Sequence, residues 1–234
     1  MIKAILMDSG KVLNKPVTGN WFIPPKFFYY VDWERFEAIP ILKRKEAFKK
    51  ANEAMKNQNL IVTEKEEYEY FVQYYRVFSE ELLCLKLNDR DVEAIAKDLV
   101  YNYRKYDFYG DVNSEIPKLS EKYKLAVVSD AWPSLKGVFK KAGFGRYFSS
   151  FVISSTKGTT KPNEIMYKTA LSELGVLPEE AVFIDDNIKN CKGAEELGIK
   201  SVALSRDKRS YFYNKIFNRK FKVIRNLKQL NKII

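Results

Sequence analysis

Short, densely apolar runs recur along the chain without the polar–apolar alternation of a half-exposed strand. They lie at residues 2–7, 125–128, 151–153, 181–184 and 201–204, with a candidate edge strand at 221–224. Helical patterns lie between or beside them at 113–123, 134–142, 163–174 and 190–197, and three glycines (Gly143, Gly175 and Gly198) stand where helix C-caps are expected. Buried strands that alternate with helices predict an α/β fold with a parallel sheet covered on both faces.

Residues 14–108 follow a different pattern. A loop rich in Pro and Gly is followed by long helical segments at 33–57, 64–83 and 89–101, and we predict no strand there. The expected organisation is therefore a core formed by residues 1–13 and 109–234, with an all-helical insert at 14–108. Aromatic and aliphatic side chains at helical spacing between Tyr68 and Phe78 are interpreted as the core of this insert. For the ring-rich loop from Trp21 to Tyr30, a core role and a role in covering a pocket both remain open.

Composition narrows the class of protein. The chain has 234 residues, of which 46% are apolar, so it can form a sizeable core. No run of eighteen apolar residues is present, so no membrane span is predicted, and the first residues lack the pattern of a signal peptide. The two cysteines, Cys84 and Cys191, are far apart and match no metal or disulfide spacing, which favours a reduced cytoplasmic protein.

Histidine is absent, and this excludes nucleophilic schemes that need a Ser–His or Cys–His pair and any zinc site with histidine ligands. The formal net charge is +11, and residues 206–234 contain ten Lys or Arg and one acidic residue, Asp207. We interpret this segment as a solvated, lysine-rich surface in preference to a nucleic-acid contact.

Polar side chains stand at the ends of three predicted strands, and a fourth polar element precedes a helix. The strand-end residues are Asp8, Ser129, Asp130, Asp185 and Asp186, and the fourth element is Lys161 followed by Pro162. In an open α/β sheet, ligands bind outside the carboxyl ends of the strands, so we expect these groups to lie together. Each of them alone is a weak signal, because Asp is common in turns and Lys is common on surfaces.

The order of these elements resembles the haloacid dehalogenase-like superfamily, whose members use four motifs in this sequence. The corresponding stretches here are MDSGKVL, VVSDAWPS, TKPNEIMYKTAL and VFIDDNIKNCKGAEELGI. The resemblance covers residues 1–13 and about 109–205, and the helical insert stands where the family has a helical cap. It implies a Rossmann-like core, a hydrolase activity and, as substrate, a small phosphorylated metabolite.

A carboxylate that attacks a phosphate ester needs positive charge nearby, because the phosphoryl oxygens are themselves anionic. Mg²⁺ prefers oxygen ligands, which Asp8, a backbone carbonyl and the Asp185–Asp186 pair can supply. By the resemblance, Asp8 is the nucleophile and a metal ligand, and the carbonyl of Gly10 is a second ligand. Asp186 would bind the metal directly, while Asp185 coordinates it or lies beside the ligands.

The remaining motif residues are expected to hold the substrate. Lys161 would add a point charge and take part in catalysis, and the Ser129 hydroxyl with neighbouring backbone N–H groups would bind phosphoryl oxygens. Asp130, which follows Ser129 directly, is assigned to substrate binding with it.

One position departs from the family pattern. Phosphatases of this family usually carry a second Asp two residues after the first, where it protonates the leaving group and later activates water; here that position is Gly10, followed by Lys11. General acid–base catalysis contributes typically 10²–10⁴ in rate. We favour a Mg²⁺-dependent phosphatase that hydrolyses a small phosphate monoester through an aspartyl-phosphate intermediate and obtains its acid elsewhere or uses a good leaving group. A catalytically weak phosphate-binding or regulatory protein and a dehalogenase stay open as alternatives. The paired acids Asp185 and Asp186 argue against the last, because they would repel each other without a cation.

Overall fold

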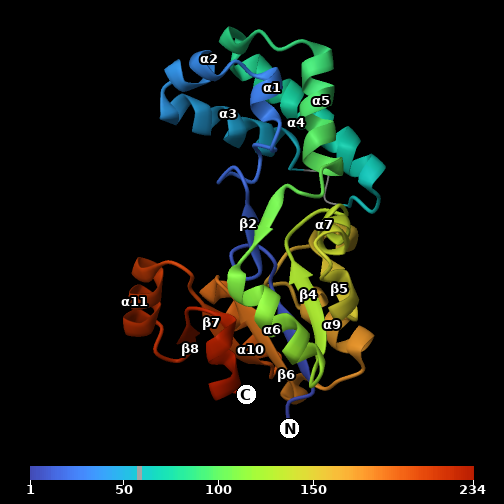
Figure 1. Ribbon diagram of the computed structural model, residues 1–234, viewed down its shortest axis with the longest axis vertical. Coiled ribbons are helices and arrows are strands. Elements are labelled where there is room, and N and C mark those ends of the chain that lie inside the picture. Colours follow the sequence, from blue (N-terminus) through green and yellow to red (C-terminus); the bar gives the residue numbers. More distant parts are fainter. Residues whose placement is uncertain (57–59) are drawn as a thin grey trace. The chain divides into compact units, whose positions relative to one another are not determined.

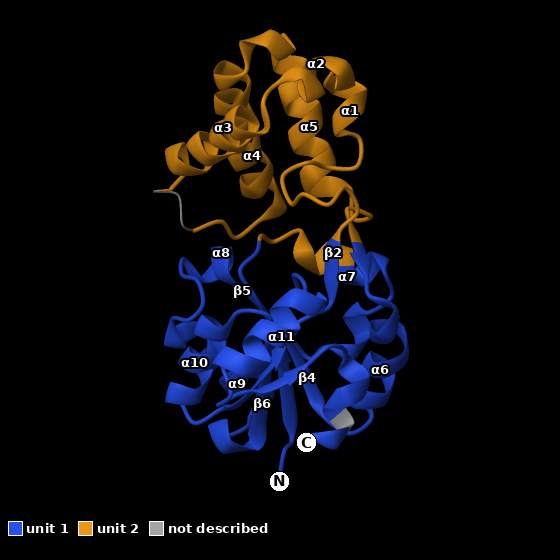
Figure 2. Ribbon diagram, turned by 90° about the vertical axis from the view of Figure 1, so that its left-hand side faces the viewer, with its two compact units in different colours: residues 1–15, 107–131, 139–234 blue, residues 16–106, 132–138 orange. Residues whose placement is uncertain are grey.

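The computed structural model describes residues 1–56 and 60–234, and Figure 1 gives the order of their elements. The chain divides into two compact units (Figure 2). Unit 1 comprises residues 1–15, 107–131 and 139–234, and unit 2 comprises residues 16–106 and 132–138. The first segment of unit 2 runs from residue 16 to residue 106, against 14 to 108 for the expected insert, and the division into a core domain and an inserted domain stays a prediction. The assignment of residues 132–138 to unit 2 was not expected.

Unit 1 contains a six-stranded parallel sheet in the order β5-β4-β1-β6-β7-β8. Its strands are β1 (Ala4–Met7), β4 (Lys124–Ser129), β5 (Ser150–Ile153), β6 (Ala181–Asp185), β7 (Lys200–Leu204) and β8 (Lys222–Ile224). The α/β class and the edge position of the last strand are confirmed. β1 lies between β4 and β6, with Leu6 opposite Ala126 on one side and Phe183 on the other. The four residues of β1 are fully buried, as the absence of polar–apolar alternation predicts.

Helices of unit 1 cover the sheet. They are α6 (Gly110–Ser120), the last part of α7 (Leu135–Lys141), α8 (Ser154–Lys157), α9 (Glu164–Leu174), α10 (Ile188–Glu196) and α11 (Lys208–Phe217), with 3-10 turns at Gly145–Tyr147, Pro178–Glu180 and Leu227–Lys232. α9 packs on β4 and β5, and α10 packs on β6 and β7. Leu6 and Phe183 form one apolar cluster with Met166 and Tyr167 of α9. The predicted C-cap role of Gly175 is confirmed, because it ends α9 in the left-handed conformation at φ 62°.

Unit 2 is largely helical. Its elements are α1 (Phe27–Tyr30), α2 (Trp33–Ala38), α3 (Ile41–Ala54), α4 (Glu64–Glu81), the 3-10 turn Leu83–Leu85 and α5 (Asp89–Tyr101). The single helix expected at 33–57 is two helices, because the chain is extended at Ile39 and Pro40 removes a backbone donor. The expected end of that helix at Asn57 lies outside the described residues.

Aromatic side chains form the core of unit 2. Phe71, Tyr75 and Phe78 of α4 are at most 1% exposed, which confirms the predicted stripe. From the loop between Trp21 and Tyr30, Phe27 is fully buried in the same core, while Tyr29 is 83% exposed. At least part of this loop therefore serves packing. Within the described residues, no helix has both the length and the apolar character needed to cross a bilayer.

Two short strands were not predicted. β2 (Asn14–Pro16) and β3 (Tyr106–Phe108) pair with each other where the chain leaves unit 1 and returns to it. In unit 2 the amide of Val17 donates to the carbonyl of Lys105, and in unit 1 the amide of Tyr109 donates to the carbonyl of Leu13. Main-chain bonds define this ladder, so the apolar pattern gave no signal for it.

Residues 132–138 belong to unit 2 because their side chains pack there. The Trp132 ring lies 5.0 Å from the ring of Phe71. The Ser134 hydroxyl donates to Glu67 at 2.6 Å and accepts from the Lys105 ammonium at 2.7 Å, and all three residues are at most 5% exposed. Burial lowers the pKa of Lys105 to about 8, although Glu67 opposes this shift, and burial raises the pKa of Glu67.

Candidate active site

Asp8 stands at the carboxyl end of the central strand β1. Its backbone amide donates to the carbonyl of Ile184 in β6 at 2.9 Å, which continues the sheet pairing by one residue. The following turn is closed by bonds between the amides of Leu13 and Asn14 and the carbonyl of Ser9, and by a bond from the Asn14 side chain to the Ser9 hydroxyl at 2.7 Å. Asp8 is therefore held by a rigid sheet on one side and a closed turn on the other.

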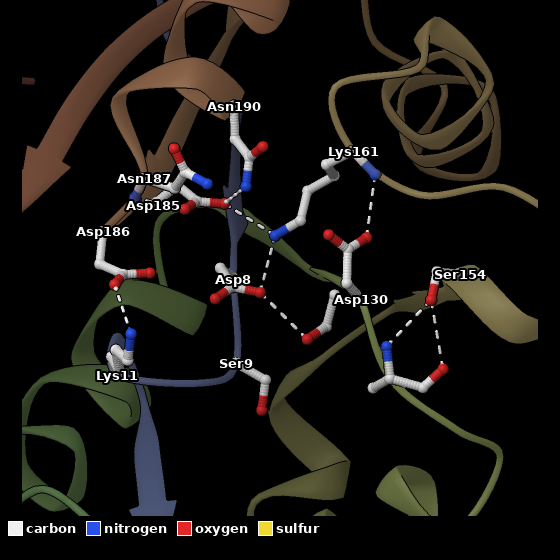
Figure 3. A network of polar contacts seen from close by, with 12 residues as sticks. Asp8, Ser9, Lys11, Asp130, Ser154, Lys161, Asp185, Asp186, Asn187 and Asn190 are labelled. Carbon is white, nitrogen blue, oxygen red and sulfur yellow. Dashed lines mark hydrogen bonds and ion pairs between the residues drawn. The ribbon is translucent and has the colours of Figure 1, made fainter. Parts of the chain in front are cut away.

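Lys161 joins two of the predicted acids. Its ammonium donates to Oδ1 of Asp8 and to Oδ2 of Asp185, each at 2.7 Å, and the Lys161 side chain is 1% exposed (Figure 3). The Ser129 hydroxyl, at the end of β4, donates to the same Asp8 oxygen at 3.0 Å. The structure thus brings together groups from three strand ends and one loop, as the sequence predicts.

Asp185 is fully buried, and both of its carboxylate oxygens accept hydrogen bonds. Oδ1 accepts from the amide of Asn187 at 2.8 Å, and Oδ2 accepts from the side chain of Asn190 at 3.1 Å as well as from Lys161. These contacts fix the carboxylate and through it the ammonium of Lys161 (Figure 3).

Burial controls the proton equilibria of this cluster. Removal from water raises the pKa of Asp8 to about 7, and the ammonium of Lys161 only partly opposes this shift. For Lys161, burial acts to lower the pKa, but Asp8 and Asp185 together hold it above its ordinary value. Lys161 is therefore a permanent cation at this site.

Three carboxylates can meet at one metal ion. Asp8, Asp185 and Asp186 each offer an oxygen, and these oxygens lie within 4.8 Å of one another. The ammonium of Lys11 lies 3.6 Å from Asp186. When all three are ionised, these carboxylates carry one more charge than Lys11 and Lys161 can neutralise. Burial and the neighbouring Asp185 accordingly raise the pKa of Asp186. An all-oxygen donor set with surplus negative charge fits Mg²⁺ or Mn²⁺ better than Zn²⁺.

Lys11 has an uncommon backbone conformation. Its φ is 58°, in the left-handed region, and its amide donates to the carbonyl of Asn14 at 2.7 Å. A non-glycine residue in this region costs roughly 1–2 kcal/mol. Gly10, by contrast, lies outside the left-handed region, although it could adopt that conformation without cost. The chain thus places a lysine, and not a glycine, at the strained position beside Asp186.

None of the predicted catalytic, substrate-binding or metal-binding roles is tested by these contacts, and those of Asp130 and Gly10 are examples. The side chain of Asp130 accepts from the backbone amide of Lys161 at 2.9 Å and so holds the Lys161 loop, while its assignment to substrate binding stays a prediction. The carbonyl of Gly10 as a metal ligand also stays a prediction. Gly10 forms a bridge with Asn14, so it belongs to the closed turn after β1.

Sequence reasoning missed some residues that organise the site. Asn190 lies in the first turn of α10 and reaches back to Asp185, five residues earlier; an amide at that spacing from the acidic pair is a signal that could have been used. The amide of Asn187 and the ion pair of Lys11 depend on the fold of two turns and had no sequence signal.

Comparison with known proteins identifies the family. Residues 41–204, more than half of the chain, match the family model described as haloacid dehalogenase-like hydrolase. The chain belongs to this family. The resemblance drawn from the four motifs is therefore confirmed.

Relatives of the chain within this hydrolase family include phosphatases. It is 28% identical over 134 residues to the phosphoserine phosphatase of Thermus thermophilus, covering 56% of this chain and 54% of that protein. It is 31% identical over 131 residues to the glyceraldehyde 3-phosphate phosphatase of Methanopyrus kandleri, covering 51% and 54%. The chain thus spans about half the length of the curated relatives it matches.

Solved structures share the fold of this chain. A haloacid dehalogenase-like phosphatase from Thermococcus onnurineus superimposes with a TM-score of 0.66 at 20% identity, over 99% of this chain and 97% of that one. A 2-haloacid dehalogenase from Pseudomonas syringae superimposes with a TM-score of 0.65 at 15% identity, over 99% and 97%. At such identities the likeness establishes the fold alone.

Proposed function

We propose that this hydrolase is a Mg²⁺-dependent phosphatase that acts on small phosphate monoesters through an aspartyl-phosphate intermediate. The observation that carries the proposal is the cluster around Asp8: a carboxylate at a rigid strand end, a buried lysine at 2.7 Å and two further acids within reach of one metal ion. The phosphatases among the curated relatives support the same reaction.

In the first step, a carboxylate oxygen of Asp8 attacks phosphorus, and the bond from phosphorus to the leaving oxygen breaks. Asp8, Asp186 and the Gly10 carbonyl, with Asp185 beside them, would hold Mg²⁺, which would supply positive charge that lets the carboxylate and the phosphate approach each other. Lys161 adds a fixed cation, and the Ser129 hydroxyl donates to an oxygen of the phosphoryl group. Asp185 positions Lys161 for this task.

In the second step, water attacks phosphorus and releases phosphate from Asp8. The usual activating carboxylate is absent, because Gly10 stands in its place. We therefore expect transfer to Asp8 to proceed faster than hydrolysis of the intermediate, most clearly with substrates whose leaving group needs no proton.

Because Gly10 provides no acid/base carboxylate, a second candidate function is a protein that binds phosphate esters and hydrolyses them only slowly. A dehalogenase is disfavoured, because carbon–halogen cleavage needs no metal and so gives no reason for the cluster of Asp8, Asp185 and Asp186.

The experiment is hydrolysis of 4-nitrophenyl phosphate with Mg²⁺ and with a chelator, in the native chain, in Asp8→Asn and in Asp107→Asn, which alters an exposed acid of unit 1. We expect metal-dependent turnover that is lost in Asp8→Asn and kept in Asp107→Asn. Activity of Asp8→Asn within tenfold of the native rate would rule out the covalent mechanism. A burst without steady turnover would instead select the second candidate.

A further inference from the structure

Unit 1 contains a cavity of about 710 Å³ beside the candidate metal ligands. Its walls come from the turn after β1, the residue before α6, the residue after β6, the loop after β7 and the first two turns of α11. The side chains that matter most here are Lys11, Tyr109, Asp186, Arg206, Arg209 and Tyr213. Because Asp186 belongs both to the acid cluster and to this wall, the cavity adjoins the site proposed for the phosphoryl group.

Some charges of the wall are already neutralised. The guanidinium of Arg206 donates to Asp111 at 2.6 Å and to the carbonyl of Val12, and it lies 4.1 Å from the ring centre of Tyr109. The carboxylate of Asp207 accepts from the amide of Ser210 at 2.8 Å and caps α11. These groups are fixed parts of the wall and leave little charge for a ligand.

Two cations remain. Lys11 is held only loosely by Asp186, at 3.6 Å, and 65% of its side chain is exposed. Arg209 is exposed, and among the described residues it takes part in no salt bridge. A metal ion bound to Asp186 would neutralise the carboxylate that the Lys11 ammonium now faces. Both cations would then be available to a ligand in the cavity. The left-handed backbone of Lys11 fits such a role, since strained residues that persist are concentrated at functional sites.

We propose that this cavity binds a second anionic group of the substrate, a carboxylate or a second phosphate, through Lys11 and Arg209. The substrates would then be small phosphate monoesters that carry another acid a few bonds from the phosphate. This inference rests on the proposed function for the place of the phosphoryl group at Asp8, but the anion site itself can be tested without turnover.

The first experiment compares 4-carboxyphenyl phosphate with phenyl phosphate. The native chain is expected to show the higher kcat/KM for the carboxylated substrate, and the ratio of the two values should fall about tenfold in Arg209→Gln, as for the loss of one charge-assisted hydrogen bond. Lys11→Gly should lower the ratio similarly, and its backbone suits glycine, so misfolding is not expected. Lys208→Gln, an exposed neighbour outside the cavity, should leave the ratio unchanged.

The second experiment measures binding of benzylphosphonate, 4-carboxybenzylphosphonate and 4-(phosphonomethyl)benzylphosphonate by calorimetry in Mg²⁺. We expect the two compounds with a second acid to bind more tightly than benzylphosphonate. Whichever of the two binds more tightly shows whether the site prefers a carboxylate or a phosphate. Loss of this preference in Arg209→Gln without any turnover of phosphates would support the anion site while refuting the proposed function. Equal binding of all three compounds, no binding at all, or ratios unaffected by both variants would overturn the proposal.

Discussion

Replacing Lys161 by Met tests the charge balance of the site most directly. The substitution keeps most of the side-chain volume and removes a cation that is 1% exposed and bonded to Asp8 and Asp185 at 2.7 Å each. Asp185 is itself fully buried, so the variant would leave a buried carboxylate pair without its counterion. Breaking a buried pair in this way costs about 3–5 kcal/mol. For a protein of this size the loss corresponds to roughly 6–20 °C in Tm.

The cost should depend on pH. The ammonium of Lys161 lowers the pKa of Asp8 and so opposes the effect of burial. In Lys161→Met the pKa of Asp8 should therefore rise above its present value of about 7. A carboxyl whose folded pKa exceeds its unfolded value destabilises the fold as pH rises between the two values. In metal-free buffer, Lys161→Met should therefore lose less stability at pH 5, where Asp8 is protonated, than at pH 8.

The chain offers a matched control and a matched probe. Lys168 and Glu164 form an ion pair at 2.8 Å, almost the same distance, but both side chains are 59% exposed, so Lys168→Met should cost at most about 0.5 kcal/mol. All three tryptophans lie in unit 2, so fluorescence follows unit 2 while circular dichroism also follows the sheet of unit 1. Denaturation of Lys161→Met with a loss below 1 kcal/mol at both pH values would refute this account of the site.

Three further outcomes are expected. Gly10→Asp, at a backbone angle that Asp can adopt, should speed steady turnover of alkyl phosphates and shrink the burst seen with aryl phosphates. If the native chain shows no burst and the variant is slower, the general acid lies elsewhere in the chain. Because Mg²⁺ needs the anion of Asp8, calorimetry should show its affinity falling about tenfold per pH unit below pH 7, and equal affinity at pH 6 and 8 would contradict the pKa of about 7. Glu67→Gln leaves Lys105 buried without its ionic partner, so unfolding followed by tryptophan fluorescence should show a loss of about 3–5 kcal/mol in the free energy of unfolding. This loss should lessen as pH rises toward 10, because the buried Lys105 is then deprotonated in the folded state and no longer needs a counterion. A loss independent of pH would argue against the pair.

Much of unit 1 could be predicted from the sequence because its elements bury dense apolar runs. The strand ends then follow from topology, which explains why Asp8, Ser129 and Asp185 were expected to meet. The strands β2 and β3 could not be predicted in the same way, because main-chain bonds between segments about ninety residues apart define them.

Other features depend on contacts that no local pattern encodes. Pro40 could have indicated the break between α2 and α3, but helical periodicity on both sides concealed it. The pairing of Lys11 with Asp186 joins two turns that are distant in sequence. Nothing in the sequence indicates that Lys11 adopts the left-handed conformation.

The division of the chain has a consequence for protein engineering. Residues 132–138 lie in unit 2 although they follow β4 directly, and the boundary at 138/139 falls inside α7. A chimera that exchanges only residues 16–106 with another family member would separate Trp132 from Phe71 and Ser134 from Glu67. The chimera would then expose an aromatic face and leave the buried Glu67 without its hydrogen-bond partner. A transplantable module therefore consists of two segments, and its second junction must be cut within a helix.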